Sequence, residues 1–232
     1  MFKARITPEM HYDDWAQQYD SDVNGWGYHA PDRVAARVKE FLINAPEPPR
    51  MLDVGIGTGL LSHKCKRVRQ DAHITGLDIS SKMLDICARR ELADDLYRLD
   101  VARDPFPFED EHFDLVIASG LMENIDDINN AMSEMARVTR PGGLMCFTYM
   151  PTTRHPYRES LAKKLRTGRT EDGKLVLGNL DLYRHNPENI KTMAKLYGIK
   201  SDKQESFVGY RTYVVMTVRY DLFAGQKIRG LQ

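Results

Sequence analysis

Three glycines at alternate positions give this sequence its clearest chemical signal. Gly55, Gly57 and Gly59 follow the short apolar run 51–54 and precede a helix-like stretch that begins at Leu60. Glycine at such a turn can adopt a positive φ and lets the backbone approach a ligand closely. In a parallel sheet, ligands bind beyond the carboxyl ends of the strands. The spacing therefore predicts a ligand-binding turn, although a tight strand–helix turn without a ligand could carry the same glycines.

Acidic residues accompany the ends of three successive predicted strands. Asp78 ends the second of them and could accept two hydrogen bonds from a ribose diol. Asp100 ends the third and could bind an adenine amino group, with the backbone N–H of Val101 offered to the ring. Asp53 lies two residues before Gly55, where a carboxylate would repel a pyrophosphate and attract a cationic cofactor. This charge argument favours S-adenosylmethionine over a nicotinamide dinucleotide, unless Asp53 only orders the turn.

Aromatic side chains near the N-terminus could close over such a ligand. Tyr12, Trp15 and Tyr19 recur at helical spacing and would lie on one face of a helix. That face could pack on the body of the protein, or form a lid in which the Tyr12 and Tyr19 hydroxyls reach the cofactor. Trp26 and Tyr28 stand in a glycine-containing loop and could line the pocket of the methyl or hydride acceptor.

Two histidines are the main candidates for a general base. His29 and His155 each lie in a predicted loop over the site, and an imidazole can take up a proton near neutral pH. A lone histidine is more often structural. Glu123 is a further candidate for proton transfer, and Tyr149 and Tyr210 are candidate walls of the acceptor pocket. No cluster of His, Cys and acidic residues predicts a metal site.

Strands and helices alternate from residue 50 to residue 150. The predicted strands cover residues 51–54, 74–77, 96–99, 113–118 and 144–149, and the predicted helices cover residues 60–69, 82–90 and 127–138. Strands separated by helices of about ten residues indicate βαβ units and a parallel sheet, with right-handed connections. The segment from Pro141 to Gly143 is predicted to be a turn before the fifth strand.

The flanking segments do not continue this alternation. We expect one domain over 1–232, made of an N-terminal helical cap over 1–45, a cofactor-binding core over 50–150, a lid insertion after the fifth strand over 151–182, and a closing helix and strands over 183–222. The lid insertion should hold a helix over 157–165, followed by a loop. Two closing strands are predicted at 207–208 and 212–218, with an antiparallel end to the sheet.

Composition narrows the class of protein. The 232 residues carry 33 Lys plus Arg and 33 Asp plus Glu, a balance that argues against a nucleic-acid-coating protein. Three cysteines without C-x-x-C spacing fit a reducing cytoplasm. The chain has no signal peptide pattern and no apolar run of the ~20 residues that a membrane helix needs. The basic run 154–169 could attract an anionic acceptor or form a solvated helix face.

Four motifs resemble those of the class I S-adenosylmethionine-dependent methyltransferases. They are Leu52-Asp-Val-Gly-Ile-Gly-Thr-Gly59, Gly76-Leu-Asp-Ile-Ser80, Asp114-Leu-Val-Ile-Ala118 and Arg140-Pro-Gly-Gly143. A looser resemblance, to the Williams–Beuren-region methyltransferase-like proteins and related small-molecule methyltransferases, is carried by Tyr12-Asp-Asp-Trp-Ala16, Tyr19-Asp20 and Gly27-Tyr-His-Ala-Pro31. In the loop 120–125, where many relatives carry a histidine, this sequence has Glu123.

The resemblance implies a Rossmann-like, doubly wound α/β fold with a seven-stranded sheet, mostly parallel with an antiparallel last strand. It also implies in-line transfer of a methyl group from S-adenosylmethionine to an O, N or C atom of a small-molecule acceptor, with S-adenosylhomocysteine as product. The residues expected to hold the cofactor are Tyr12, Tyr19, Asp53, Gly55, Gly57, Gly59, Asp78, Ile79, Met83, Asp100, Val101 and Ser119. Two alternatives are a nicotinamide-dependent oxidoreductase and a non-catalytic adenosine-cofactor-binding protein. No strand-four motif for base methylation is present, so nucleic acid is not expected as a substrate.

Overall fold

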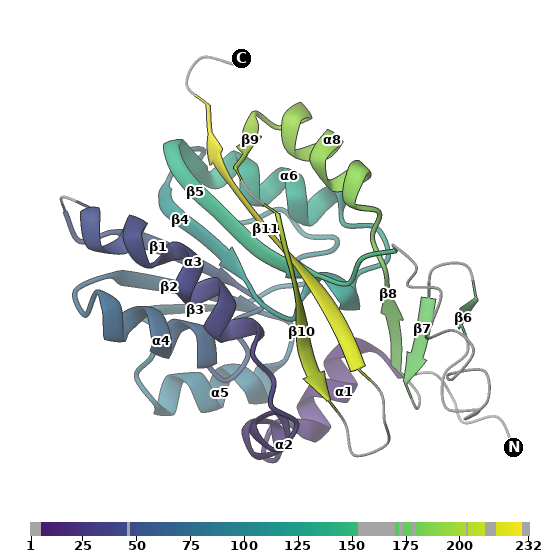
Figure 1. Ribbon diagram of the computed structural model, residues 1–232. Coiled ribbons are helices and arrows are strands. Elements are labelled where there is room, and N and C mark those ends of the chain that lie inside the picture. The colour runs from purple at the N-terminus through teal and green to yellow at the C-terminus, as the bar shows by residue number, and fades with distance from the viewer. Residues whose placement is uncertain are drawn as a thin grey trace, which may run out of the picture.

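Parallel strands form the centre of the sheet in the computed structural model, which describes residues 6–45, 47–152, 170–171, 174–177, 180–202, 204–211 and 217–228 (Figure 1). The strand bounds are β1 Arg50–Val54, β2 His73–Asp78, β3 Asp95–Arg98, β4 Phe113–Ala118 and β5 Thr139–Tyr149. They run parallel in the order β3-β2-β1-β4-β5. The order reverses between β1 and β4, and a crevice for ligands is expected beyond the carboxyl ends of the strands there.

The other end of the sheet is antiparallel, as predicted. Strand β11 (Thr217–Lys227) runs antiparallel to β5 and pairs with β10 (Glu205–Arg211) on its other side. These strands complete the expected sheet of seven, to which the short β9 (Ile199–Ser201) adds a further pairing with β11 among the described residues. Strand β10 extends beyond the predicted 207–208, while residues 212–216 of the strand predicted over 212–218 lie outside the described residues. Strand β11 continues past residue 218 to Lys227, because Asp221, which interrupts the apolar run, is buried and accepts hydrogen bonds from Tyr149 and Ser206.

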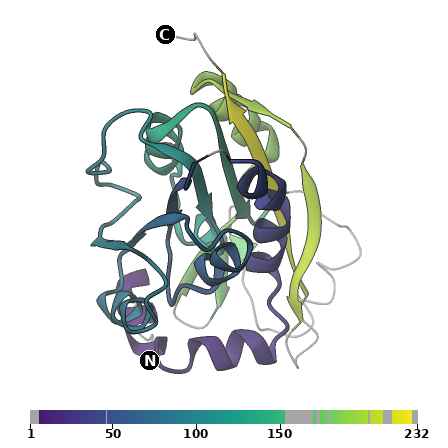
Figure 2. The same cartoon turned by 90° about the vertical axis from the view of Figure 1, so that its left-hand side faces the viewer.

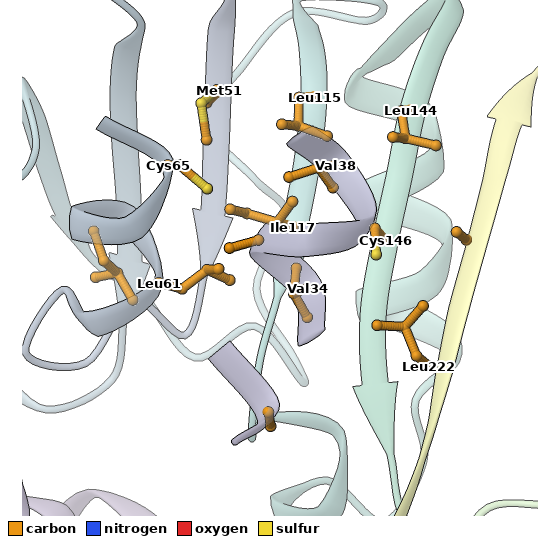
Figure 3. Packing of buried hydrophobic residues seen from close by; sticks show 14 of the residues in the cluster. Val34, Val38, Met51, Leu61, Cys65, Leu115, Ile117, Leu144, Cys146 and Leu222 are labelled. Carbon is orange, nitrogen blue, oxygen red and sulfur yellow. The ribbon is translucent and has the colours of Figure 1, made fainter. Parts of the chain in front are cut away.

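Helices cover both faces of the sheet. The helices on the two faces are α3 Ala30–Asn44, α4 Leu60–Val68, α5 Ser81–Arg89, α6 Asn129–Val138 and α8 Pro187–Leu196. Side chains of α3 and α4 share a buried cluster with one set of strand residues, which Figure 3 shows around Met51, Leu115 and Ile117. Residues of α6 and α8 pack with the alternate set, which includes Leu52 and Val116. Since alternate residues of a strand face opposite sides, both faces of the central strands are buried.

The N-terminal segment forms two helices where the sequence predicted one aromatic face. Helix α1 (Pro8–Trp15) and helix α2 (Tyr19–Gly25) are separated by a turn in which Gln18 N donates to Trp15 O at 3.0 Å. The Trp15 indole N–H donates to Asp22 in α2 at 2.7 Å and fixes the angle between the helices. The expectation that Tyr12, Trp15 and Tyr19 share one helix face is therefore wrong, although the Trp15 and Tyr19 rings still meet at 4.8 Å. Figure 2 shows this purple segment along one end of the sheet.

Two further predictions of local structure differ from the structure. The segment Pro141–Gly143, expected to be a turn before the strand, is an irregularity within β5, where Gly142 has φ +80° and the pairing with β4 shifts register between Phe113 and Leu115. In place of the expected loop after residue 165, the strands β6 (Thr170–Glu171), β7 (Lys174–Leu177) and β8 (Leu180–Tyr183) form a small antiparallel sheet. The helix predicted over 157–165 lies outside the described residues, and the division of the chain into four segments remains a prediction.

Candidate active site

A cavity of about 860 Å³ lies at the carboxyl ends of β1, β2, β3 and β4. It brings together most of the residues that the sequence assigned to the cofactor: Tyr12, Tyr19, Gly55, Gly57, Asp78, Ile79, Met83, Asp100, Val101 and Ser119. The strands bring these residues together because parallel strands end at the same edge of the sheet. Of the remaining two, Asp53 lines a smaller cavity beside it, and Gly59 begins helix α4.

The glycine turn is shaped for a ligand at its centre and for packing at its end. Gly57 has φ +56°, lines the cavity, and has no atom within 4 Å of the position that a Cβ would take. A side chain there would project into open space. Gly59 has φ +87°, and a Cβ there would come within 2.7 Å of the Leu92 side chain. Glycine is required at both positions, but for different physical reasons.

The carboxylate of Asp78 connects the end of β2 to the glycine turn. Its Oδ2 accepts a hydrogen bond from Gly57 N at 2.8 Å, and its Oδ1 accepts one from Ser80 N at 2.9 Å. Burial raises the pKa of Asp78 to about 6, while these backbone hydrogen bonds favour the charged form. A carboxylate has about four acceptor positions. The backbone N–H of Ile79 also donates to this carboxylate, so about one acceptor position remains for a ribose hydroxyl.

The end of β3 supplies the other predicted nucleoside contacts. Asp100 and Val101 both line the cavity, and Oδ1 of Asp100 accepts a hydrogen bond from Ala102 N at 3.1 Å. Asn130 Nδ2 donates to the carbonyl of Val101 at 3.1 Å and fixes this turn from helix α6. The turn is thus held in place by residues outside β3, as a rigid contact for a base would need.

A second cavity, of about 30 Å³, lies beneath the glycine turn. Asp53, Thr58, Tyr28 and Ser119 are among its lining residues. Asp53 is 1% exposed and accepts a hydrogen bond from the Ser62 hydroxyl at 2.7 Å. Burial raises the pKa of this carboxyl to about 7. The Ser62 contact supports an ordering role for Asp53, and its place in the cavity is compatible with attraction of a cation.

Two of the three candidate acid–base residues, His29 and Glu123, belong to the described part of the structure. His29 is exposed, at 3.7 Å from Asp32, and does not line either cavity. Glu123 is 4% exposed in the short 3-10 helix η1 (Met122–Asn124), directly behind residues that line the large cavity, and burial raises its pKa to about 7. Its Oε2 has no hydrogen-bond partner among the described residues. His155 lies outside the described residues.

The candidate acceptor residues are also divided. Tyr28 lines the small cavity, while the Trp26 ring packs against Trp15 at 5.3 Å and does not reach either cavity. Tyr149 is fully buried in β5, where its hydroxyl donates to Asp221 at 3.2 Å, and it lies outside the lining of both cavities. Tyr210 belongs to β10, and its side chain is outside the described part of the structure.

Several residues that line the large cavity were not predicted from the sequence. Asn124 lines the cavity, accepts a hydrogen bond from the Tyr12 hydroxyl at 3.2 Å and donates to Gly120 O at 3.0 Å. Its position in the loop after β4, at the expected ligand edge, could have identified it. Asp181 and Tyr183 reach the cavity from β8, and nothing in the local sequence predicts that placement.

Charged groups at the large cavity are mostly acidic. Among the described lining residues the acids are Glu9, Asp78, Asp100, Asp104, Asp126, Asp127 and Asp181, and the bases are Arg98 and Arg103. Arg98 pairs with Glu9, and Arg103 lies 3.4 Å from Asp100. Within the described part of the chain, we find no group of three or more His, Cys, Asp or Glu residues placed to hold a metal ion. No helix in that part is long and apolar enough to cross a membrane.

Comparisons with known proteins agree with this geometry. A family model described as a methyltransferase domain matches residues 52–147. Methyltransferase-like protein 27 from Homo sapiens is 32% identical over 162 residues, which are 69% of this chain and 65% of that protein. The ubiquinone/menaquinone biosynthesis C-methyltransferase UbiE from Vibrio cholerae is 28% identical over 214 residues, 87% of this chain and 80% of that protein. The chain therefore spans less than two thirds of the length of the human relative.

A solved structure shares the whole fold. The [4+2]-cyclase SpnF has a TM-score of 0.72 and 18% sequence identity, over 98% of this chain and 100% of that chain. At this level of identity the likeness concerns the fold. Together with the family model and the sequence relatives, it supports a class I S-adenosylmethionine-dependent methyltransferase, an enzyme class whose cofactor is S-adenosylmethionine. The nicotinamide alternative has no support among these matches.

The residues of the cavity fit this cofactor. The open space beside Gly57 admits a ligand against the backbone, and Asp78 keeps an acceptor position for a ribose hydroxyl. Acids outnumber bases among the described lining residues, and the two arginines there both face carboxylates. A cofactor with a cationic sulfur matches this charge distribution.

Proposed function

We propose that the protein transfers a methyl group to an O, N or C atom of a small molecule. The observation that carries this proposal is the extent of the large cavity. Beyond the turn at Gly57 and the end of β3, it continues past Asn124 to Asp127 and to Tyr183 of β8. Its volume of about 860 Å³ lies in the range typical of small-molecule sites and leaves room for an acceptor beside the cofactor.

Each part of the cofactor would be held by a different strand end. Asp78 would bind the ribose, Asp100 and Val101 the adenine, and the glycine turn would lie against the remaining part near Asp53. When bound, S-adenosylmethionine supplies a methyl group that is activated by positive sulfur. The chain itself needs to orient the acceptor and to exclude water, which are the main contributions a protein makes to such a displacement.

The acceptor end of the cavity sets limits on the acceptor's charge. Asp126, Asp127 and Asp181 line this end, and the described lining as a whole is acidic. This favours a neutral or cationic acceptor. The expectation of an anionic acceptor rests on the basic run 154–169, which lies outside the described residues. The name of UbiE, a C-methyltransferase of ubiquinone and menaquinone biosynthesis, supports a small organic acceptor without specifying it for this chain.

Proton removal, where the acceptor requires it, would fall to a residue near Asn124. Glu123 is the described candidate that lies in the loop lining the cavity, and with a pKa of about 7 it could accept a proton near neutral pH. We also propose that the enzyme acts in the cytoplasm, since its three cysteines are free and buried, as expected in a reducing compartment.

The test combines ligand binding with product formation. Calorimetry should show binding of S-adenosylmethionine and S-adenosylhomocysteine, and no binding of NADH. Screening of small amines, phenols and carbon acids should then find acceptors that release S-adenosylhomocysteine and gain 14 mass units, which is one methyl group in place of a hydrogen. A folded protein that binds NADH instead would contradict the assignment of S-adenosylmethionine as the cofactor. A protein that binds S-adenosylhomocysteine and methylates nothing would support the non-catalytic alternative.

A further inference from the structure

Two Tyr-Asp pairs occupy the N-terminal cap, Tyr12-Asp13 in α1 and Tyr19-Asp20 at the start of α2. Both tyrosines line the large cavity. Each aspartate turns to a different loop of the cofactor site. The cap therefore contacts the site twice, with an aromatic ring and a carboxylate each time.

Asp20 holds the glycine turn. Its Oδ1 accepts a hydrogen bond from the Thr58 hydroxyl at 2.6 Å, and its Oδ2 accepts one from Arg90 Nη1 at 2.5 Å. Arg90 Nη1 also donates to the carbonyl oxygen of Thr58 at 3.3 Å. Thr58 stands between Gly57 and Gly59 and is 1% exposed. A turn rich in glycine has little conformational preference of its own, so these contacts restrict its backbone.

Asp13 holds the other side of the site. Its Oδ1 accepts hydrogen bonds from the Ser80 hydroxyl at 2.6 Å and from Lys82 N at 3.2 Å, at the start of helix α5. The Ser80 hydroxyl in turn accepts from Met83 N, and the Ser80 backbone N donates to Asp78. The hydrogen bond from Ser80 lowers the pKa of Asp13, so this carboxylate is charged at neutral pH. Asp13 thus holds Ser80, and Ser80 in turn holds Asp78, the carboxylate proposed to bind the ribose.

We propose that Asp13 and Asp20 are positioning residues, which hold Ser80 and Thr58 so that Asp78 and the glycine turn keep the geometry that binds the cofactor. The identity of the ligand rests on the proposed function, while the positioning itself does not. Tyr12 and Tyr19 place the cap against the cavity. The carboxylates of Asp13 and Asp20 then hold the two loops, at Ser80 and at Thr58, that border the cofactor site. Loss of either contact should loosen one loop and leave the other loop in place.

The first test compares Asp20→Asn with Asp14→Asn. Asp14 is an exposed acid of the same cap, so the control removes the same charge without touching the site. Hydrogen exchange of the ligand-free protein should become faster over residues 55–60 in Asp20→Asn, with residues 113–118 unchanged. The same measurement on Asp13→Ala, with Asp14→Ala as its control, should show faster exchange over 78–83, because alanine keeps no oxygen to accept from Ser80 and Lys82 N. Calorimetry with S-adenosylhomocysteine should show about tenfold weaker binding in each, which is about 1.4 kcal/mol, and no change in Asp14→Asn or Asp14→Ala.

A double-mutant cycle separates positioning from a general loss of stability. Thr58→Val removes the hydroxyl that donates to Asp20, so Asp20→Asn should cost less affinity in that background than in the wild type, and the remaining loss reports the Arg90 contact. Additive losses, or exchange over 55–60 and 78–83 equal to that of the wild type, would overturn the proposal. If the wild-type protein does not bind S-adenosylhomocysteine, the proposed function fails, and the exchange measurements still decide whether the two aspartates position the loops.

Discussion

At the scale of single residues, Asp78 has two roles that the sequence presents as one. Its carboxylate is available to a ribose, and it also accepts hydrogen bonds from Gly57 N and Ser80 N. Hydrogen bonds to a charged group contribute about 1.5–3 kcal/mol each. Asp78→Ala should therefore weaken S-adenosylmethionine binding at least about tenfold, as measured by calorimetry. An unchanged dissociation constant in a folded variant would mean that Asp78 does not bind the ribose.

Gly57 tests whether the cofactor lies against the turn. Its missing Cβ faces open space, so a larger side chain would not clash with the protein, but it would enter the cavity. Valine at φ +56° is also strained. Gly57→Val should abolish S-adenosylhomocysteine binding while thermal unfolding remains cooperative. Normal binding by this variant would place the cofactor elsewhere. Gly59→Val, which would meet Leu92 inside the fold, should instead lower the unfolding temperature.

At the scale of elements, the two cap helices form one wall of the cavity. Ile6 to Glu9, Tyr12 and Tyr19 line it, and Ala16 packs with Met83 and Ile86 of helix α5. This cluster is small in comparison with the two clusters that flank the sheet. Elements with few buried contacts open at a lower free energy than the core.

We therefore expect hydrogen exchange over residues 8–30 to be fast without ligand and to slow when S-adenosylhomocysteine binds. The core strands β1 and β4 should be protected in both states and serve as the internal control. Equal exchange in the cap with and without ligand would indicate a fixed wall. The matching expectation for residues 151–182 concerns a segment of which the structure describes only a part.

At the scale of the whole molecule, three carboxyl groups pass from a buried site to water when the protein unfolds. Burial raises the pKa of Asp53, Asp78 and Glu123 to about 7, 6 and 7. A raised pKa in the folded state means that the folded protein holds the proton more tightly. Each group thus contributes stability below its pKa in the unfolded chain, and this contribution is lost as the pH rises through the folded pKa.

Glu123→Gln removes one of these titrations. Its stability relative to the wild type should rise between pH 5 and pH 8, by on the order of 3 kcal/mol, as the wild-type carboxyl is forced to ionise. Urea unfolding at several pH values measures this slope, while any constant offset reports the packing of the amide. A difference in stability that does not change with pH would show that Glu123 is already ionised in the folded protein.

The core of the fold could be predicted because its signals are local. Strand β4 was predicted with its observed bounds, since residues 113–118 are apolar except for Asp114, include the β-branched Val116 and Ile117, and are buried on both faces apart from Asp114. The cap was harder, because the break between α1 and α2 depends on Trp15 meeting Asp22. The strands β6 to β8 were missed, since among the described residues they pair with each other and not with the main sheet, and they carry no long apolar run.

The parallel core, the glycine turn and the carboxylates at the strand ends could be predicted from the sequence, because each follows from residue types a few positions apart. The other side chains that reach the site are known only from the folded structure. Tyr12 meets Asn124 across 112 positions of the chain, and Asp13 meets Ser80 across 67. Tyr149, a candidate for the acceptor pocket, instead donates its hydroxyl to Asp221 within the sheet. Such contacts form when packed layers bring distant segments together. A local sequence pattern cannot predict them, because burial and strand pairing depend on interactions between elements that are far apart in the chain.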